Sequence, residues 1–204
     1  PKFITLLLFS SIFGMSTSVM AQEKYHTRVS TNFGMSARHS EDELPYSRTP
    51  VVFPERVAKI NAGTRLLQEA DGSWSIVGGW EMADADQLVL SEKSIFSKDF
   101  DTSSWYNATV PGTVLTTLVN QGVYPDPYYG ANNMAIPESL CRKDWWYRTE
   151  LPLSSELLAK PQLELLFNGI NYRADIWFNG VKLGTINGAF IRGRFDITDI
   201  ASSE

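Results

Sequence analysis

The segment that most constrains the fold is residues 176–184, which fit two short strands joined by a two-residue turn. Asn179 and Gly180 suit a type I′ turn, because both central residues of that turn need a positive φ. Apolar residues recur at every second position on both sides of the turn, which is the period of a β-strand. The segment therefore predicts a β-hairpin, relative to which the rest of the chain can be placed.

The composition supports a domain with a substantial core and excludes some partners. The chain has 204 residues, of which 43% are hydrophobic, and a net charge of -5. No Lys/Arg run is present, so we expect no nucleic-acid partner. The single cysteine, Cys141, cannot form an intrachain disulfide. His26 and His39 lack other ligand residues at metal-site spacing, so we expect no metal and no cofactor.

Residues 1–21 have the pattern of a secretory signal peptide. Lys2 supplies the positive charge, a short apolar run follows, and small or medium residues precede the end of the segment at Ala21. The run is too short to span a bilayer. We expect cleavage after Ala21, a secreted or periplasmic protein, and no membrane contact after cleavage. The alternative is a buried N-terminal helix.

The remaining chain divides at about residue 73. Residues 22–72 are rich in polar residues and proline, and we interpret them as a linker or irregular N-terminal extension. From residue 73 to 204, short alternating segments predict about seven strands. One short helix is expected after Thr113, a suitable N-cap, and before Gly122, which can end it in the left-handed conformation.

This arrangement predicts an all-β sandwich, because no βαβ alternation is present. A jelly roll has about eight strands. We therefore expect the 73–204 sandwich to be truncated before its last strand or strands, as part of a longer chain.

The loop at residues 123–143 is the candidate ligand site, since a long loop without regular structure is commonly functional. Aromatic faces stack on sugar rings, and Asn and Asp bind hydroxyl groups. A rigid loop whose tyrosines pack on the sandwich or on a neighbouring domain is an equally weighted alternative. The candidate substrate-binding residues are Asp126, Tyr128, Tyr129, Asn132 and Asn133.

Four motifs follow one another along the chain: WYNATVPGTVL (residues 105–115), YPDPYYGANN (124–133), WWYR (145–148) and FNGINYRADIWFNG (167–180). Taken in this order, they resemble glycoside hydrolase family 2, in its β-mannosidase, exo-β-glucosaminidase and endo-β-mannosidase branch. The resemblance implies a galactose-binding-like jelly roll, the sugar-binding domain that precedes an immunoglobulin-like sandwich and a TIM barrel. In that layout the barrel carries the catalytic Glu pair of a retaining hydrolase, so no catalytic residue is expected in this chain.

Three functions follow as hypotheses. In the first, the chain is the accessory N-terminal domain of a secreted β-glycosidase, which supports the catalytic barrel and shapes the sugar pocket. Its partners would be a β-linked oligosaccharide or glycoside and its own downstream catalytic domains. In the second, it is an independent carbohydrate-binding module. In the third, it is a structural interaction sandwich whose aromatic residues are buried against partner domains.

Overall fold

The computed structural model describes residues 2–9, 29–31, 35–37, 52–88, 95–97, 99–130 and 132–202. Most of the predicted signal peptide and most of residues 22–51 of the expected extension lie outside these residues. The strands are β1 (Lys2–Phe9), β2 (Val29–Thr31), β3 (Met35–Ala37), β4 (Arg65–Gln68), β5 (Trp74–Val77), β6 (Glu81–Asp84), β7 (Tyr106–Asn107), β8 (Trp145–Leu151), β9 (Glu164–Phe167), β10 (Arg173–Phe178), β11 (Val181–Asn187) and β12 (Gly193–Asp196). The helical segments are η2 (Ala85–Gln87), α2 (Val114–Asn120), η3 (Asn132–Ala135), η4 (Glu138–Arg142), α3 (Ser155–Leu158) and α4 (Thr198–Ser202).

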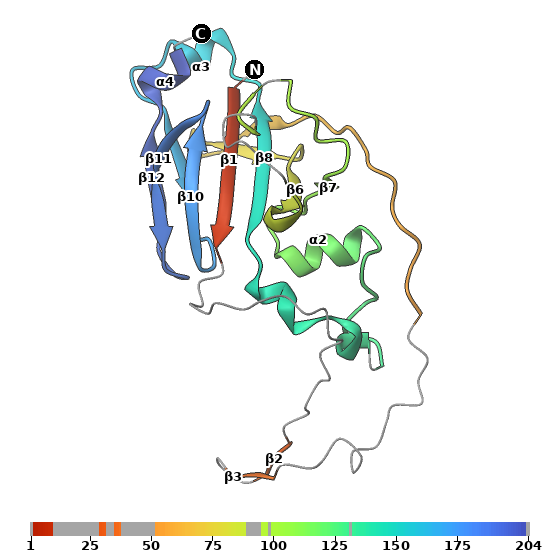
Figure 1. The fold of residues 1–204 in the computed structure, drawn as a ribbon. Helices are drawn as coiled ribbons and strands as arrows, with labels where there is room; N and C mark the ends of the chain where they lie inside the picture. The colour runs from red at the N-terminus through yellow and green to blue at the C-terminus, as the bar shows by residue number, and fades with distance from the viewer. Residues whose placement is uncertain are drawn as a thin grey trace.

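A six-stranded antiparallel sheet forms the main layer, in the order β11-β10-β1-β8-β6-β7 (Figure 1). Two-stranded sheets pair β12 with β9, β4 with β5, and β2 with β3. The architecture is mostly β with a few short helices, as the sequence predicts. Residues 2–9 of the expected signal peptide form β1, which lies between β8 and β10. A short apolar run has the same pattern in a leader and in a buried strand, so periodicity alone does not separate the two.

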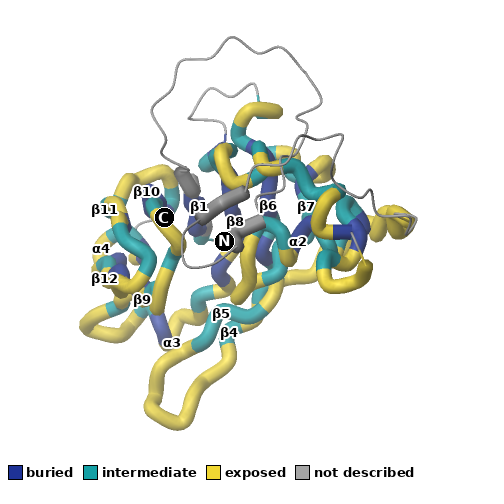
Figure 2. The backbone as a smooth tube through the Cα atoms, turned by 90° about the horizontal axis from the view of Figure 1, so that it is seen from below, coloured by how far each residue is buried: buried dark blue, intermediate teal, exposed yellow. Residues whose placement is uncertain are grey.

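The two faces of the six-stranded sheet bury different clusters, because successive strand residues point to opposite sides. On β8, Trp145 and Tyr147 belong to the larger core, whereas Trp146 lies in a smaller cluster with Ile95 and Trp105. The larger core also takes up side chains of β9, α2 and α4. Figure 2 shows that buried residues follow the strands of this sheet, while the turn between β4 and β5 is exposed.

The hairpin predicted around Asn179 and Gly180 is confirmed. Their φ angles are 47° and 80°, as a type I′ turn requires. Phe178, which is fully buried, points into the larger core. Trp177 points to the opposite face, where its ring lies 4.8 Å from that of Phe96 between centroids.

The short helix is also confirmed as α2. Thr113 caps it, and its side chain accepts a hydrogen bond from the Thr116 amide. Gly122 follows the helix with a φ of 68°. A Cβ at this glycine would lie 2.0 Å from the Glu55 carbonyl oxygen, so the position requires both the conformation and the small size of glycine.

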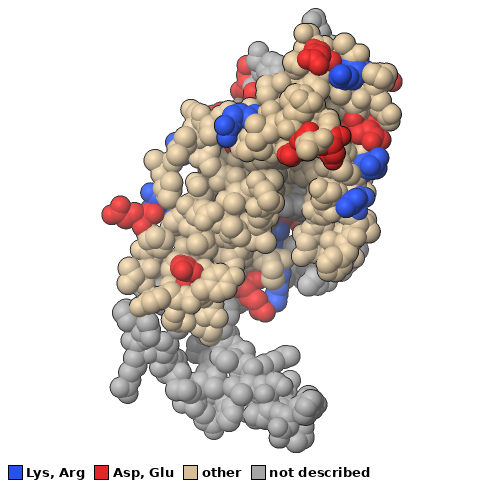
Figure 3. All heavy atoms as spheres, turned by 180° about the vertical axis from the view of Figure 1, so that it is seen from behind, with Lys and Arg blue, Asp and Glu red and all other residues tan. Residues whose placement is uncertain are grey.

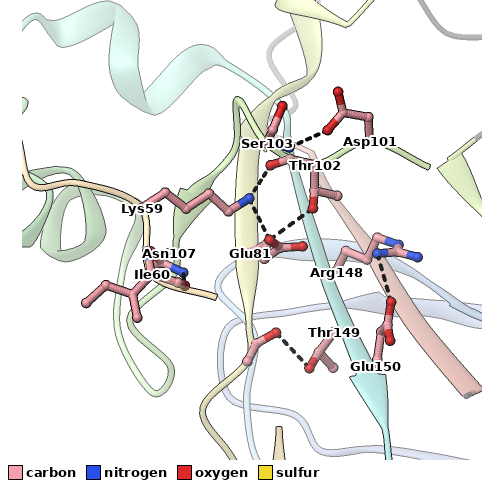
Figure 4. A network of polar contacts seen from close by, with 11 residues as sticks. Lys59, Ile60, Glu81, Asp101, Thr102, Ser103, Asn107, Arg148, Thr149 and Glu150 are labelled. Atoms are coloured by element: carbon pink, nitrogen blue, oxygen red, sulfur yellow. Dashed lines mark hydrogen bonds and ion pairs between the residues drawn. The ribbon is translucent and has the colours of Figure 1, made fainter. Parts of the chain in front are cut away.

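The segment from residue 52 to 63 has no regular structure, but an ion pair and hydrogen bonds hold it against the rest of the domain. Lys59 forms an ion pair of 2.6 Å with Glu81. The Asn107 side chain donates to the Ile60 carbonyl at 2.7 Å and accepts from the Ile60 amide at 2.8 Å. Figure 4 shows these contacts. The expected division at residue 73 falls inside the β4–β5 hairpin. β4 has only four residues, so the alternation within it is too short to predict a strand from the sequence alone.

Candidate functional site

The loop that carries the candidate binding residues connects α2 to β8 and is built from consecutive turns. The Asp126 side chain accepts a hydrogen bond of 2.9 Å from the Tyr128 amide. The Tyr129 amide donates to the Asp126 carbonyl, and the Asn132 amide donates to the Tyr129 carbonyl. The Asn132 side chain donates to the Asp126 carbonyl at 2.9 Å. These bonds fix the backbone of the loop without using the tyrosine side chains.

The five candidate residues divide into two groups. Tyr128 is 96% exposed and Tyr129 is 67% exposed, and Asp126 and Asn133 are also exposed. Asn132 is only 6% exposed, and its amide is used to close the loop. Four candidates are therefore available to a ligand, whereas Asn132 holds the loop that presents them. The loop is aromatic, as expected, but the expectation that residues 123–143 lack regular structure is wrong, because η3 and η4 lie in its second half. Contact with a sugar stays a prediction.

A large groove that the sequence did not predict lies beside this loop, with a volume of about 1760 Å³. Pro127 and Asn133 line it, as do Trp74 of β5 and Trp145 of β8. Much of its lining also belongs to the larger core, including Trp145, Tyr147 and Leu165. The groove is therefore the open space between the layers of the sandwich. Its apolar lining comes from strands that are distant in sequence, so no local motif reveals it.

A polar network covers the opposite face of the six-stranded sheet (Figure 4). Thr102 donates to Glu81 at 3.0 Å, and Glu81 pairs with Lys59. Arg148 is almost fully buried and donates to the Ser97 carbonyl at 3.2 Å. Burial lowers the pKa of Arg148, and the nearby carboxylates of Glu150 and Glu81 oppose this effect. The bonds of Lys59 and Thr102 to Glu81, and of Arg148 to Ser97, each hold one segment to another, so we interpret the network as structural.

The described part of the chain contains no group of three or more His, Cys, Asp or Glu residues that could hold a metal ion. Cys141 is exposed, and its thiol donates to the Glu138 carbonyl. Charged side chains are scattered over the face drawn in Figure 3, much of which is uncharged. None of the helices within the described residues is long and apolar enough to cross a membrane.

Comparison with known proteins places the domain in a family. The family model described as "Glycosyl hydrolase 2 galactose-binding domain-like" matches residues 80–204. An exo-β-D-glucosaminidase of Amycolatopsis orientalis is 33% identical over 132 residues, which are 63% of this chain and 12% of that enzyme. A mannosylglycoprotein endo-β-mannosidase of Lilium longiflorum is 34% identical over 134 residues, which are 63% of this chain and 14% of that enzyme.

A solved structure has the same architecture. The crystal structure of an exo-chitosanase of Amycolatopsis orientalis superposes with a TM-score of 0.54 at 33% identity, covering 63% of this chain and 15% of that chain. This chain thus spans only a small part of the length of these relatives. The matched residues include β6 through β12 and the loop with Tyr128 and Tyr129. The chain belongs to the galactose-binding domain-like family of glycosyl hydrolase 2.

Proposed function

We propose that this chain is the N-terminal accessory domain of a family 2 β-glycosidase of the β-mannosidase or exo-β-glucosaminidase type. The observation that carries the proposal is the family match over residues 80–204. A relative named as an exo-β-D-glucosaminidase and a relative named as an endo-β-mannosidase both match this part of the chain. Because the segment is common to enzymes with different sugars, its role is general support of the enzyme, and selection of the sugar lies largely elsewhere.

In this proposal the domain supports the catalytic barrel and forms one wall of the sugar pocket. The loop with Tyr128 and Tyr129 supports the second role, since it is fixed by its own hydrogen bonds and exposes both rings. A loop whose backbone is already ordered loses little conformational entropy on binding a sugar. The partners are then a β-linked oligosaccharide or glycoside and the downstream domains of the same polypeptide.

The catalytic carboxyl pair is assigned to those downstream domains. Retaining hydrolysis needs two carboxyl groups about 5–5.5 Å apart. The test compares the complete gene product with residues 1–204 alone, on p-nitrophenyl β-mannoside and β-glucosaminide. The proposal expects hydrolysis of at least one substrate by the complete product and none by the shorter chain. A complete product inactive on both, or hydrolysis by the shorter chain, would contradict it.

The proposal includes export, with cleavage after Ala21 to give a secreted or periplasmic enzyme. The support is the charged start and short apolar run of residues 1–21. N-terminal sequencing of the enzyme recovered from the periplasm or medium should begin at Gln22. Recovery in the cytoplasm with the first 21 residues attached would overturn this part of the proposal.

An independent carbohydrate-binding module is the second candidate function, favoured by the exposure of both Tyr128 and Tyr129. Affinity electrophoresis of residues 1–204 in gels that contain mannan, chitosan or xylan separates the two functions. Retardation that is lost in Tyr128→Ala/Tyr129→Ala favours the module. If no glycan retards the chain, the module is excluded and the domain acts only within the larger enzyme.

A further inference from the structure

A second cavity, of about 230 Å³, lies between the end of β6 and the loop that follows α2. Its volume is far above the ~10–15 Å³ that one water molecule needs and below the ~300 Å³ at which drug-sized sites begin, so it suits a ligand of about monosaccharide size. It shares Lys143 and Trp145 with the large groove, but its other polar residues do not line that groove. We call it the polar cavity, and its polar lining residues are Asp84, Gln87, Tyr106, Tyr124, Ser139 and Lys143.

An ion pair between Asp84 and Lys143 forms the charged part of the polar cavity. Asp84 is only 4% exposed, and its Oδ2 atom lies 2.5 Å from the Lys143 Nζ atom. The hydrogen bond between them raises the pKa of Lys143, so the ammonium form is held beside the carboxylate. The two charges cancel within the lining. A neutral ligand therefore fits the polar cavity better than an anion or a cation, whose charge would lose its hydration without a free counter-charge.

Both members of this pair keep hydrogen-bonding capacity for a ligand. Asp84 accepts from the Asp86 amide and from Lys143, which uses two of the roughly four acceptor positions of a carboxylate. Lys143 uses one of its three donors among the described residues. Gln87 is exposed and adds an amide that both donates and accepts. A ligand with several neighbouring hydroxyl groups matches this lining, because each hydroxyl can donate to one group and accept from another.

The rest of the wall is apolar. Leu118 and Trp145 are buried, Leu140 is half-buried, and all three belong to or pack on the larger core. The Trp145 indole N–H is buried and has no hydrogen-bond partner among the described residues. An apolar wall with a few convergent polar groups is the usual composition of a small-molecule site. A sugar ring, which carries C–H groups as well as hydroxyls, fits both kinds of wall.

We propose that the polar cavity binds one neutral hexose unit, whose hydroxyl groups are held by Asp84, Lys143 and Gln87. The site is distinct from Tyr128 and Tyr129, which are exposed and do not line the polar cavity. The loop after α2 then contributes to two sugar contacts, one on the surface and one in a cavity. The choice of a hexose rests on the proposed function, whereas the cavity and its polar groups do not depend on it.

The first test is saturation-transfer difference NMR of the complete gene product with methyl α-D-mannoside and, separately, methyl α-D-glucoside. We expect transfer to at least one probe, and loss of most of it in Ser139→Phe, because Ser139 is exposed and a larger ring there fills the polar cavity. Ser155→Phe, on α3 and in the lining of neither cavity, should keep the transfer. No transfer to either probe, or equal transfer in Ser139→Phe and the unaltered protein, would overturn the proposal.

The second test removes one polar group without filling the polar cavity. Gln87→Leu keeps a similar size but loses the amide, so the Kd of the bound probe should rise about two- to tenfold, as expected for one hydrogen bond. Gln162→Leu, also exposed but on the wall of the large groove, is the matched control and should leave the Kd unchanged. An unchanged Kd in Gln87→Leu would contradict the assigned lining. Neither readout uses hydrolysis, so both results are independent of whether the complete product is active.

Discussion

The side-chain amide of Asn132 lies 2.9 Å from the backbone carbonyl oxygen of Asp126 and closes the loop that exposes Tyr128 and Tyr129. The residue that shapes the candidate site is therefore a buried one, and the residues that can meet a sugar are its neighbours. Stability of the loop and binding by the loop can be tested separately, because different residues carry them.

Asn132→Asp removes the donor of this bond with almost no change in size. It should destabilise the domain by about 1–3 kcal/mol, since the Asp126 carbonyl loses one of its two donors and a carboxylate becomes buried. Urea denaturation followed by tryptophan fluorescence measures the change. The control is Asn133→Asp, one residue away and exposed, for which we expect a change within about 0.5 kcal/mol. Equal effects of the two variants would contradict the structural role of Asn132.

Asp175 on β10 accepts hydrogen bonds from Lys182 at 2.8 Å and from Thr185. Burial alone would raise the pKa of Asp175, but these two hydrogen bonds and the Lys182 charge outweigh it, so its pKa is lowered. The folded state therefore favours the carboxylate. The stability that Asp175 contributes is present above its unfolded pKa of about 3.9 and is lost as the pH falls through the lower folded value.

Asp175→Asn should accordingly cost about 1–3 kcal/mol at neutral pH and less as the pH falls below about 4. Denaturation midpoints measured from pH 3 to pH 7 test this. Glu164→Gln is the matched control, because Glu164 pairs with Arg194 on the surface at 3.1 Å and should contribute less than about 1 kcal/mol. A cost for Asp175→Asn that does not change with pH would show that the charge is not involved.

Phe178 tests the role of the hairpin in the core. It is fully buried, so Phe178→Ala should destabilise the domain by about 3–5 kcal/mol through lost burial and a residual cavity. Phe190, in the segment between β11 and β12, is fully exposed, and Phe190→Ala should be neutral. Thermal denaturation of the two variants measures the difference. A small effect of Phe178→Ala would place the hairpin outside the core.

Asn107 begins an Asn-Ala-Thr glycosylation sequon. Its side chain, however, donates a hydrogen bond to the Ile60 carbonyl and accepts one from the Ile60 amide. Protein that folds before modification should therefore remain unmodified at Asn107 in a glycosylating host, as measured by intact mass. Asn107→Ala should release the segment from residue 52 to 63 and speed its proteolysis. Asn120→Ala, which removes a hydrogen bond to Thr109, should leave that segment protected. Full occupancy of the sequon by a glycan would contradict this account.

The sequence predicts the elements whose conformation depends on a few neighbouring residues, such as a turn or the two ends of a helix. Asn179 and Gly180 set the hairpin turn, and Thr113 and Gly122 bound α2. The pairing of β1 with β8 and β10, and the groove between the layers, depend on contacts between distant segments, which periodicity cannot provide. The buried role of Asn132 was missed for the same kind of reason, because an Asn that closes a loop and an Asn that binds a ligand have the same sequence signal.

The most direct test of the proposed pocket wall is the KM of the complete enzyme with Tyr128→Ala/Tyr129→Ala. Loss of two aromatic contacts worth about 0.5–1.5 kcal/mol each should raise KM about tenfold and leave kcat nearly unchanged, since this binding is equal in the ground and transition states. Phe190→Ala, an exposed aromatic residue on another loop, should leave both constants unchanged. An unchanged KM in the double variant would contradict the account and assign the loop a purely structural role.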